Sequence, residues 1–180
     1  MDFVVFALLA ALQANPSQDT FGVSCDLQGL YDEMAQATAV SYTARDVDLY
    51  HGVFYTPDWV FVDAQGQRHP WTELRDQTIS QAGEHRFDAI YQVLQDATIT
   101  ADGATTTIDY IVVRSIDDRD GKYGKAGAKH TIAEVTALRD TWSKTGVVWR
   151  LKMREQLGGT KEYVDKMPPD IAHRRCPPWK

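Results

Sequence analysis

The sequence predicts an α+β protein, in which helices from the first half of the chain pack against a curved antiparallel sheet formed by the second half. Two observations predict this class. Apolar side chains recur at helical spacing up to Gly83, and beyond it the pattern changes to the alternation that is typical of strands. Helices gathered on one side of an antiparallel sheet define an α+β layer fold. With 180 residues, of which 43% are apolar, the chain is expected to form one globular domain.

Three helices are expected before the long strands begin. The first covers residues 26–43, where the apolar positions follow helical spacing: Leu27, Leu30, Tyr31, Met34 and Thr38. The second is expected to begin at Asp46, whose carboxylate can cap the first-turn N–H groups, and to end before Pro57. The third is expected to begin at Pro70, because the first turn of a helix tolerates a residue without an N–H group.

The strands follow from β-branched and aromatic runs that are separated by turn residues. Residues 59–63 predict a short strand between the second and third helices. Longer strands are expected at residues 87–100 and 105–116, and a hairpin at residues 137–155. The proline-rich tail, residues 158–180, shows no periodicity and is expected to wrap the surface or remain loose.

The hairpin makes the most detailed prediction. With Thr145 and Gly146 as a two-residue turn, Trp142 faces Trp149, and alternation assigns one mostly apolar set of side chains to the inner face of the sheet. The residues of this inner-face set are Leu138, Asp140, Trp142, Trp149, Leu151, Met153 and Glu155. The opposite face carries basic side chains, Arg154 among them, and is expected to face solvent.

Two segments carry a resemblance to a known family. FYTPDWVFVDAQGQ (residues 54–67) and TWSKTGVVWRL (residues 141–151) resemble the SnoaL-like group of the nuclear-transport-factor-2-like superfamily over residues 26–157. The resemblance implies a cystatin-like α+β cone, in which a curved sheet wraps around N-terminal helices and closes one conical pocket. It also implies that the inner-face set of the hairpin walls this pocket and contacts the ligand. Proteins of this shape have many activities, so the resemblance says more about fold than about reaction.

The resemblance also suggests catalytic residues. In relatives of the ketosteroid isomerase type, an Asp before the turn glycine is the general base, and Asp63 stands at the matching place. The alternative is a local role, because an Asp that begins a turn commonly accepts hydrogen bonds from its own backbone. Asp140 on the apolar wall and His69 near the pocket mouth are the candidate partners of Asp63. Leu138 stands where the isomerase pattern has a protonated acid, so the sequence departs from that chemistry.

Composition excludes several function classes. The formal net charge is −6 and no basic patch is present, so no nucleic-acid partner is expected. The histidines do not show the spacing of metal ligands, and no glycine-rich phosphate loop precedes a helix. The sequence therefore predicts no metal and no cofactor.

The N-terminal residues predict export. An apolar run from Phe3 to Leu12 ends in small residues near Ala14, which is typical of a signal peptide over residues 1–14; a buried helix is the alternative. The mature protein is then expected to be periplasmic or secreted, without stable membrane insertion, and to begin with a linker over residues 15–25.

The cysteine count bears on the same compartment. In an oxidising compartment Cys25 and Cys176 can form a disulfide, although two unrelated thiols are the alternative.

Three functions are consistent with this sequence. The first is an exported protein that binds a small apolar molecule in a conical pocket. The second is an acid/base enzyme, such as an isomerase, dehydratase or cyclase, with Asp63 as the general base. The third is a non-catalytic dimerisation module, and a homodimer is compatible with all three.

Overall fold

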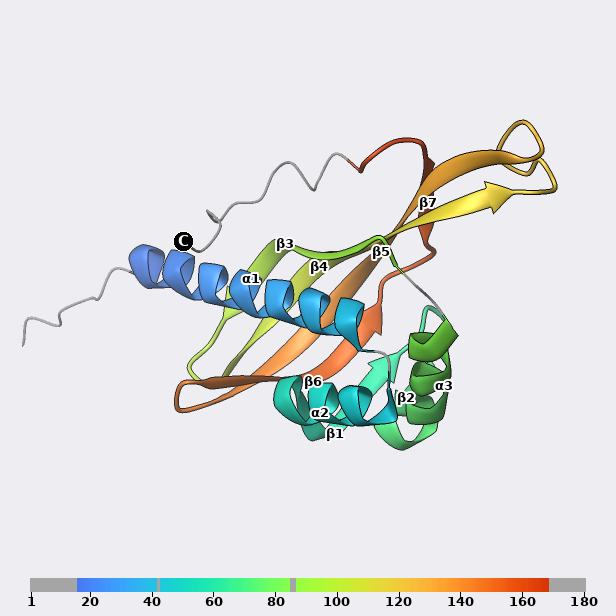
Figure 1. Cartoon of the computed structure of the whole chain (residues 1–180). Coiled ribbons are helices and arrows are strands. Elements are labelled where there is room, and N and C mark those ends of the chain that lie inside the picture. The colour runs from blue at the N-terminus through green and yellow to red at the C-terminus, as the bar shows by residue number, and fades with distance from the viewer. Residues whose placement is uncertain (1–15, 42, 85–86, 169–180) are drawn as a thin grey trace, which may run out of the picture.

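The structure is a computed structural model that describes residues 16–41, 43–84 and 87–168. Figure 1 shows a long helix, α1 (Pro16–Val40), lying along one face of a curved sheet. Two shorter helices, α2 (Ala44–Phe54) and α3 (Trp71–Glu84), gather at one end of that sheet. The predicted order of two helices, a short strand, a helix and then long strands is confirmed.

The sheet is mixed rather than wholly antiparallel. Its strands are β1 (Tyr55–Val62), β2 (Arg68–Pro70), β3 (Ala89–Ile99), β4 (Gly103–Asp118), β5 (Ala128–Thr145), β6 (Val148–Gln156) and β7 (Lys161–Val164). Their order is β2-β1-β6-β5-β4-β3, with β7 paired to β5. All neighbours are antiparallel except β1 and β6, which run parallel. The expected antiparallel sheet thus gains one parallel pair, because β1 returns alongside the last strand of the hairpin.

The inner face of α1 forms the centre of the hydrophobic core. Leu27, Tyr31 and Met34 are fully buried at the spacing that the sequence predicts. They pack against buried side chains of β4, β5 and β6. No helix in the described part of the chain is long and apolar enough to cross a membrane.

The N-terminal part of α1 corrects one prediction. The helix begins at Pro16, so the expected linker over residues 15–25 is helical from Pro16 onward. Residues 1–14, the predicted signal peptide, lie outside the described residues, as does Cys176.

The N-cap residue of α2 differs from the expected one, Asp46. Thr43 is the N-cap residue, and its Oγ1 accepts from the backbone N–H of Asp46 at 3.2 Å. Asp46 Oδ2 accepts in turn from the backbone N–H of Thr43 at 3.1 Å, which completes a capping box. Asp46 therefore supports the cap from the third helical position and does not form it.

One strand begins earlier than expected, and one strand was not expected at all. β1 begins at Tyr55, directly after α2, and Pro57 lies where the pairing with β6 is interrupted, which suits a residue without an N–H group. The tail that was expected to lack regular structure contains β7, which pairs with residues 132–135 of β5. Four residues without alternation give no strand signal, so only the pairing partner defines β7.

The β5–β6 hairpin has a different turn from the predicted one. Gly146 and Val147 form it, and the φ angle of Gly146 is 62°. Glycine with positive φ at the first of two turn positions is the type II′ arrangement. Trp142 therefore faces Leu151 instead of Trp149.

A β-bulge then changes which side chains of β6 face the core. The register shifts between Thr141 and Trp142, and Lys152 is the extra residue that has no partner on β5. Arg154 consequently turns inward, opposite Asp140, and is 7% exposed. The prediction that Arg154 faces solvent is wrong for this reason.

Candidate functional site

A buried ion pair lies on the helix-covered face of the sheet. Arg154 donates to both carboxylate oxygens of Asp140, from Nε to Oδ1 at 2.8 Å and from Nη2 to Oδ2 at 2.7 Å. Asp140 is fully buried. Two parallel charge-assisted hydrogen bonds fix the guanidinium plane as well as compensating for lost hydration.

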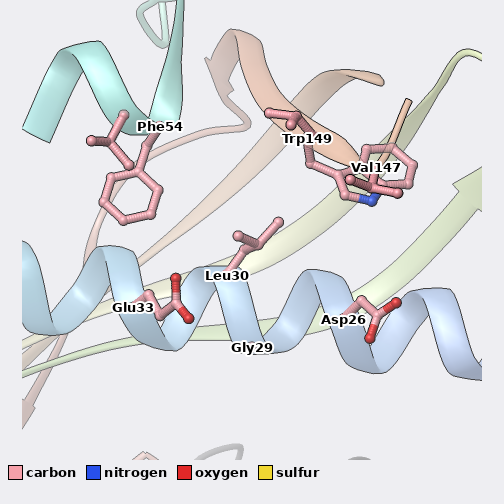
Figure 2. A pocket seen from close by; sticks show the side chains of 9 residues that line it. Asp26, Gly29, Leu30, Glu33, Phe54, Val147 and Trp149 are labelled. Carbon is pink, nitrogen blue, oxygen red and sulfur yellow. The ribbon is translucent and has the colours of Figure 1, made fainter. Parts of the chain in front are cut away.

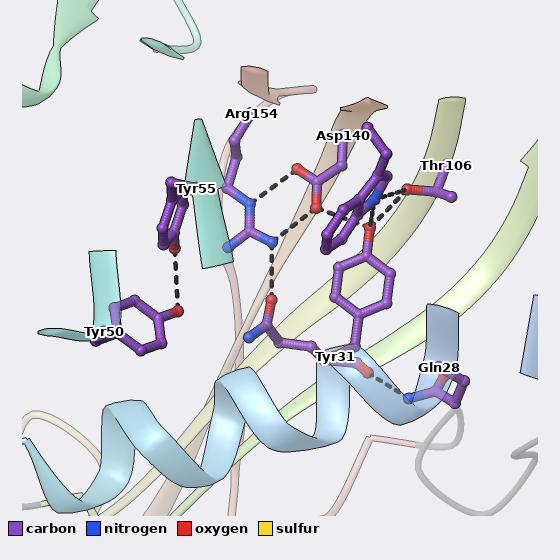
Figure 3. Close-up of polar contacts among 9 residues, drawn as sticks. Gln28, Tyr31, Tyr50, Tyr55, Thr106, Asp140 and Arg154 are labelled. Atoms are coloured by element: carbon purple, nitrogen blue, oxygen red, sulfur yellow. Dashed lines mark hydrogen bonds and ion pairs between the residues drawn. The ribbon is translucent and has the colours of Figure 1, made fainter. Parts of the chain in front are cut away.

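Tyr31 of α1 extends this pair into a network (Figure 3). Its hydroxyl donates to Asp140 Oδ2 at 2.8 Å and accepts from Trp142 Nε1 at 2.8 Å. It also lies 2.6 Å from Thr106 Oγ1. Burial, with the nearby Asp140 carboxylate, raises the pKa of Tyr31 well above its usual value, so the phenol remains a donor at neutral pH.

Gln92 of β3 holds the guanidinium from the other side. Its Oε1 accepts from Arg154 Nη2 at 2.8 Å, and its backbone carbonyl accepts from Gln28 Nε2 at 2.8 Å. Gln28 Oε1 accepts in turn from the N–H of Leu94 at 2.8 Å. Side chains from α1, β3 and β5 thus position one arginine of β6.

One nitrogen of Arg154 remains available. Nη1 makes no hydrogen bond with any described residue, and Figure 3 shows it pointing away from Asp140 toward Tyr55. Gln92 Nε2 is buried and also has no partner among the described residues. Two donors are therefore available to an acceptor that the described part of the chain does not supply.

A cavity of about 500 Å³ lies beside this network, and we call it the β1–α3 cavity. Tyr55, Trp59 and Phe61 of β1 line it together with Leu74 of α3, and Arg154 adds a buried charge. Its polar lining comes from β2 and α3: His69, Glu73, Gln77, Thr78 and Gln81. A volume of this size, with an aromatic wall from β1 facing a polar wall from β2 and α3, is compatible with a small-molecule site.

His51 of α2 supports the aromatic wall of the cavity. Its ring stacks on Trp71 and Tyr55, with centroids 4.1 Å and 5.1 Å away, and Trp59 meets it edge-on. Burial lowers the pKa of His51, so the imidazole is neutral at neutral pH. The wall is therefore an uncharged aromatic surface whose rings hold one another in place.

His69 lies between two carboxylates on the rim of the cavity. Its Nδ1 is 2.8 Å from Glu73 Oε1, and its Nε2 is 3.1 Å from Asp63 Oδ2. Hydrogen bonds to Glu73 and then to Asp63 raise the pKa of His69. Both ring nitrogens therefore have partners, and protonation of the imidazole is favoured.

Comparisons with known proteins bear on the fold. No family model and no curated protein sequence matches the chain. A protein of unknown function from Mycobacterium tuberculosis is 16% identical with a TM-score of 0.51, and the match covers 90% of this chain and 82% of that one. An NTF2-like protein with a cystatin-like fold from Novosphingobium aromaticivorans is 16% identical with a TM-score of 0.49, over 82% and 90% of the two chains. An NTF2-like superfamily protein from Salmonella enterica has the same identity and TM-score, over 79% and 94%.

The chain shares its overall fold with the Mycobacterium tuberculosis protein. The α+β class that the sequence predicts is confirmed, because helices precede and cover a mixed sheet. Similarities at these identities concern the fold alone, so the SnoaL-like assignment stays a prediction.

Asp63 has the local turn role that was the alternative prediction. Its Oδ1 accepts from the backbone N–H groups of Gln65 and Gln67 at 2.9 Å and 2.8 Å. The hydrogen bond to His69 and those from the backbone lower the pKa of Asp63. No hydrogen bond or ion pair between described residues joins Asp63 to Asp140, and its role as a base stays a prediction.

The predicted ligand wall does not coincide with the β1–α3 cavity. Leu138, Trp142 and Leu151 are buried in the core against α1. Trp149 lines a separate groove of about 450 Å³ between α1, α2 and the β5–β6 turn, where Figure 2 shows it across from Leu30.

The last two wall residues lie beyond the bulge. Met153 Sδ is 3.8 Å from an Arg68 nitrogen, and Glu155 forms an ion pair with Arg139 at 3.1 Å. Both are half-buried, and neither lines the β1–α3 cavity.

Arg154 and the lining residues of β1 were missed from the sequence. The run from Trp59 to Val62 carried a signal, because alternation in an aromatic strand predicts one face turned toward the helices. Arg154 carried none: it follows Arg150 and Lys152 at period 2, as a solvent-facing row would. Only the bulge distinguishes it from them.

Proposed function

We propose that the protein binds a small, largely apolar molecule in the β1–α3 cavity. The observation that carries this proposal is the combination of a 500 Å³ cavity with aromatic walls and a buried guanidinium in its lining. A ring compound would contact Trp59 and Phe61 on one side and Leu74 on the other. The NTF2-like fold is compatible with such a pocket, and the fold alone does not name the ligand.

Native mass spectrometry of protein purified from its host tests the proposal. We expect an added mass from a bound small molecule, and we expect a substitution that fills the cavity to remove it. Gln77→Trp is suitable, because Gln77 is exposed on α3 and lines the cavity.

Asp76→Trp is the matched control. It introduces the same side chain at the neighbouring residue, which is exposed and does not line the cavity. Unliganded wild-type protein, or equal loss of the bound molecule in both variants, would count against the proposal.

Acid/base catalysis is the second candidate function, and His69 is the observation that favours it. His69 and Glu73 line the cavity, whereas Asp63 is behind His69 and does not. If the protein is an enzyme, we therefore expect His69, whose raised pKa favours the protonated form, to act as a general acid. Asp63, whose pKa is lowered, would be a weak general base.

Deuterium exchange tests this second candidate. Any co-purified molecule is incubated with the protein in D2O, and deuterium incorporation is followed by NMR. His130 also pairs with a carboxylate, that of Asp165 at 2.8 Å, and does not line the cavity. Catalysed exchange that is lost in His69→Gln but kept in His130→Gln supports this candidate. Exchange that is equal in both variants argues for binding without catalysis.

A further inference from the structure

We propose that Arg154 anchors an uncharged carbonyl oxygen of the ligand through Nη1. This inference rests on the proposed function and names the chemical class of its ligand. Two nitrogens of the Arg154 guanidinium, Nε and Nη2, donate to protein acceptors, whereas Nη1 does not.

The available donor is fixed before any ligand binds. Asp140 holds Nε and Nη2 at 2.8 Å and 2.7 Å, and Gln92 Oε1 holds Nη2 at 2.8 Å. Because the plane is held at three points, the direction of Nη1 is set by the core and not by the ligand. A donor that is already oriented loses little conformational entropy on binding.

The unpaired Nε2 of Gln92 supports the same conclusion. It belongs to an amide whose oxygen is hydrogen-bonded to the guanidinium, so two donors without acceptors lie on adjoining groups. Buried donors are rarely left without acceptors in folded proteins. Gln92 does not line the cavity, so a ligand oxygen there would accept from Nη1 of Arg154 and would meet the Gln92 amide only through that guanidinium.

The charges around the cavity favour a neutral ligand oxygen over a carboxylate. The charge of Arg154 is balanced by Asp140, Glu73 adds a carboxylate to the rim, and Asp63 adds another behind His69. A carboxylate ligand would lose its hydration beside an arginine that is already paired. A carbonyl oxygen accepts the same hydrogen bond at a lower desolvation cost.

Three probes with the same ring system test this inference. The probes are 2-acetylnaphthalene, 2-ethylnaphthalene and 2-naphthoate, which carry a ketone, no oxygen and a carboxylate. Binding is measured by quenching of tryptophan fluorescence and by calorimetry. We expect the ketone to bind at least about tenfold more tightly than the hydrocarbon, the effect of one hydrogen bond to a charged donor, and no less tightly than the carboxylate.

Arg154→Lys is the decisive variant. Lysine keeps a positive charge beside Asp140 but has no third nitrogen, so the preference for the ketone should disappear while binding of 2-ethylnaphthalene remains. Arg139→Lys makes the same change in the exposed ion pair with Glu155 and should leave all three affinities unchanged. Gln92→Met is a second variant that leaves the Arg154–Asp140 pair intact, and it should weaken the ketone preference even if Arg154→Lys does not fold.

The outcomes separate the two proposals. If no probe binds and no co-purified molecule is found, the proposed function fails. If all three probes bind equally, or if the carboxylate binds most tightly, the β1–α3 cavity is a binding site but the carbonyl anchor is wrong. If the ketone preference survives in Arg154→Lys, another group supplies the hydrogen bond.

Discussion

At the scale of single residues, Asp140 and Arg154 each compensate for the buried charge of the other. Asp140 is fully buried, and its two oxygens receive Arg154 and Tyr31. Removing one member of such a pair leaves a charge in the core without its counter-ion. Replacing both with apolar side chains leaves none, so the single and double changes have different consequences.

We predict that Asp140→Ala lowers the free energy of unfolding by about 3–5 kcal/mol, as measured by urea denaturation. Asp140→Leu combined with Arg154→Met should recover most of that loss. Glu155→Ala breaks the exposed pair with Arg139 and should cost less than about 1 kcal/mol. Equal losses for Asp140→Ala and Glu155→Ala would contradict the account.

His69 in the cavity lining and His51 behind the aromatic wall should have pKa values shifted in opposite directions. Glu73 and Asp63 raise the pKa of His69, whereas burial lowers the pKa of His51. The contribution of His69 to stability is then fully present below its ordinary pKa of about 6.5 and is lost as the pH rises through its folded value. His51 has the reverse effect, because stability falls as the pH drops through about 6.5 toward its folded value.

NMR titration of the imidazole signals tests this prediction. We expect His69 to titrate above the ordinary range and His51 below it, and we expect Glu73→Gln to bring the pKa of His69 down. His51 should not respond to that substitution. Two histidines that titrate together near the ordinary value would rule the prediction out.

At the scale of elements, the β5–β6 hairpin decides which residues reach the cavity. Alternation correctly placed Leu138 and Leu151 in the core, because β5 has no extra residue and Leu151 lies on the turn side of the bulge in β6. It could not place Arg154, since the extra residue Lys152 stands between Leu151 and Met153 as an ordinary outward-facing residue would. The same bulge carried Met153 and Glu155 away from the positions that alternation gave them.

The turn of this hairpin gives a prediction about Gly146. Its φ of 62° is costly for any residue with a Cβ, although nothing lies within 4 Å of the place that a Cβ would occupy. Gly146→Ala should therefore lower the free energy of unfolding by about 1 kcal/mol, through backbone strain alone.

Gly159→Ala is the control, because Gly159 also has open space around it and has no positive φ. It should be neutral or slightly stabilising. Thermal or urea unfolding of both variants gives the comparison, and a Gly146→Ala protein as stable as Gly159→Ala would show that the turn is not type II′.

At the scale of the molecule, the sequence was sufficient for the fold but not for the cavity. The order of helices and strands follows from periodicity, and the buried face of α1 follows from its spacing at Leu27, Tyr31 and Met34. The cavity depends on the parallel pairing of β1 with β6, which brings Phe61 opposite Arg154. Residues that lie so far apart in the chain share no local pattern, so nothing short of the tertiary structure brings them together.

Export is a prediction for the whole molecule. N-terminal sequencing of the protein from its host should find Asn15 as the first residue, after removal of residues 1–14. Peptide mapping without reduction should find Cys25 linked to Cys176. An intact Met1 together with two free thiols would overturn both expectations. Size-exclusion chromatography with light scattering on the same sample tests the predicted homodimer.

The most direct test of the central claim is a crystal structure of the protein with 2-acetylnaphthalene. The account predicts that the ring lies in the β1–α3 cavity between Trp59 and Leu74, with the ketone oxygen within hydrogen-bond distance of Arg154 Nη1. A ring that binds instead in the groove beside Trp149, or a ketone oxygen that points out to solvent, would contradict it.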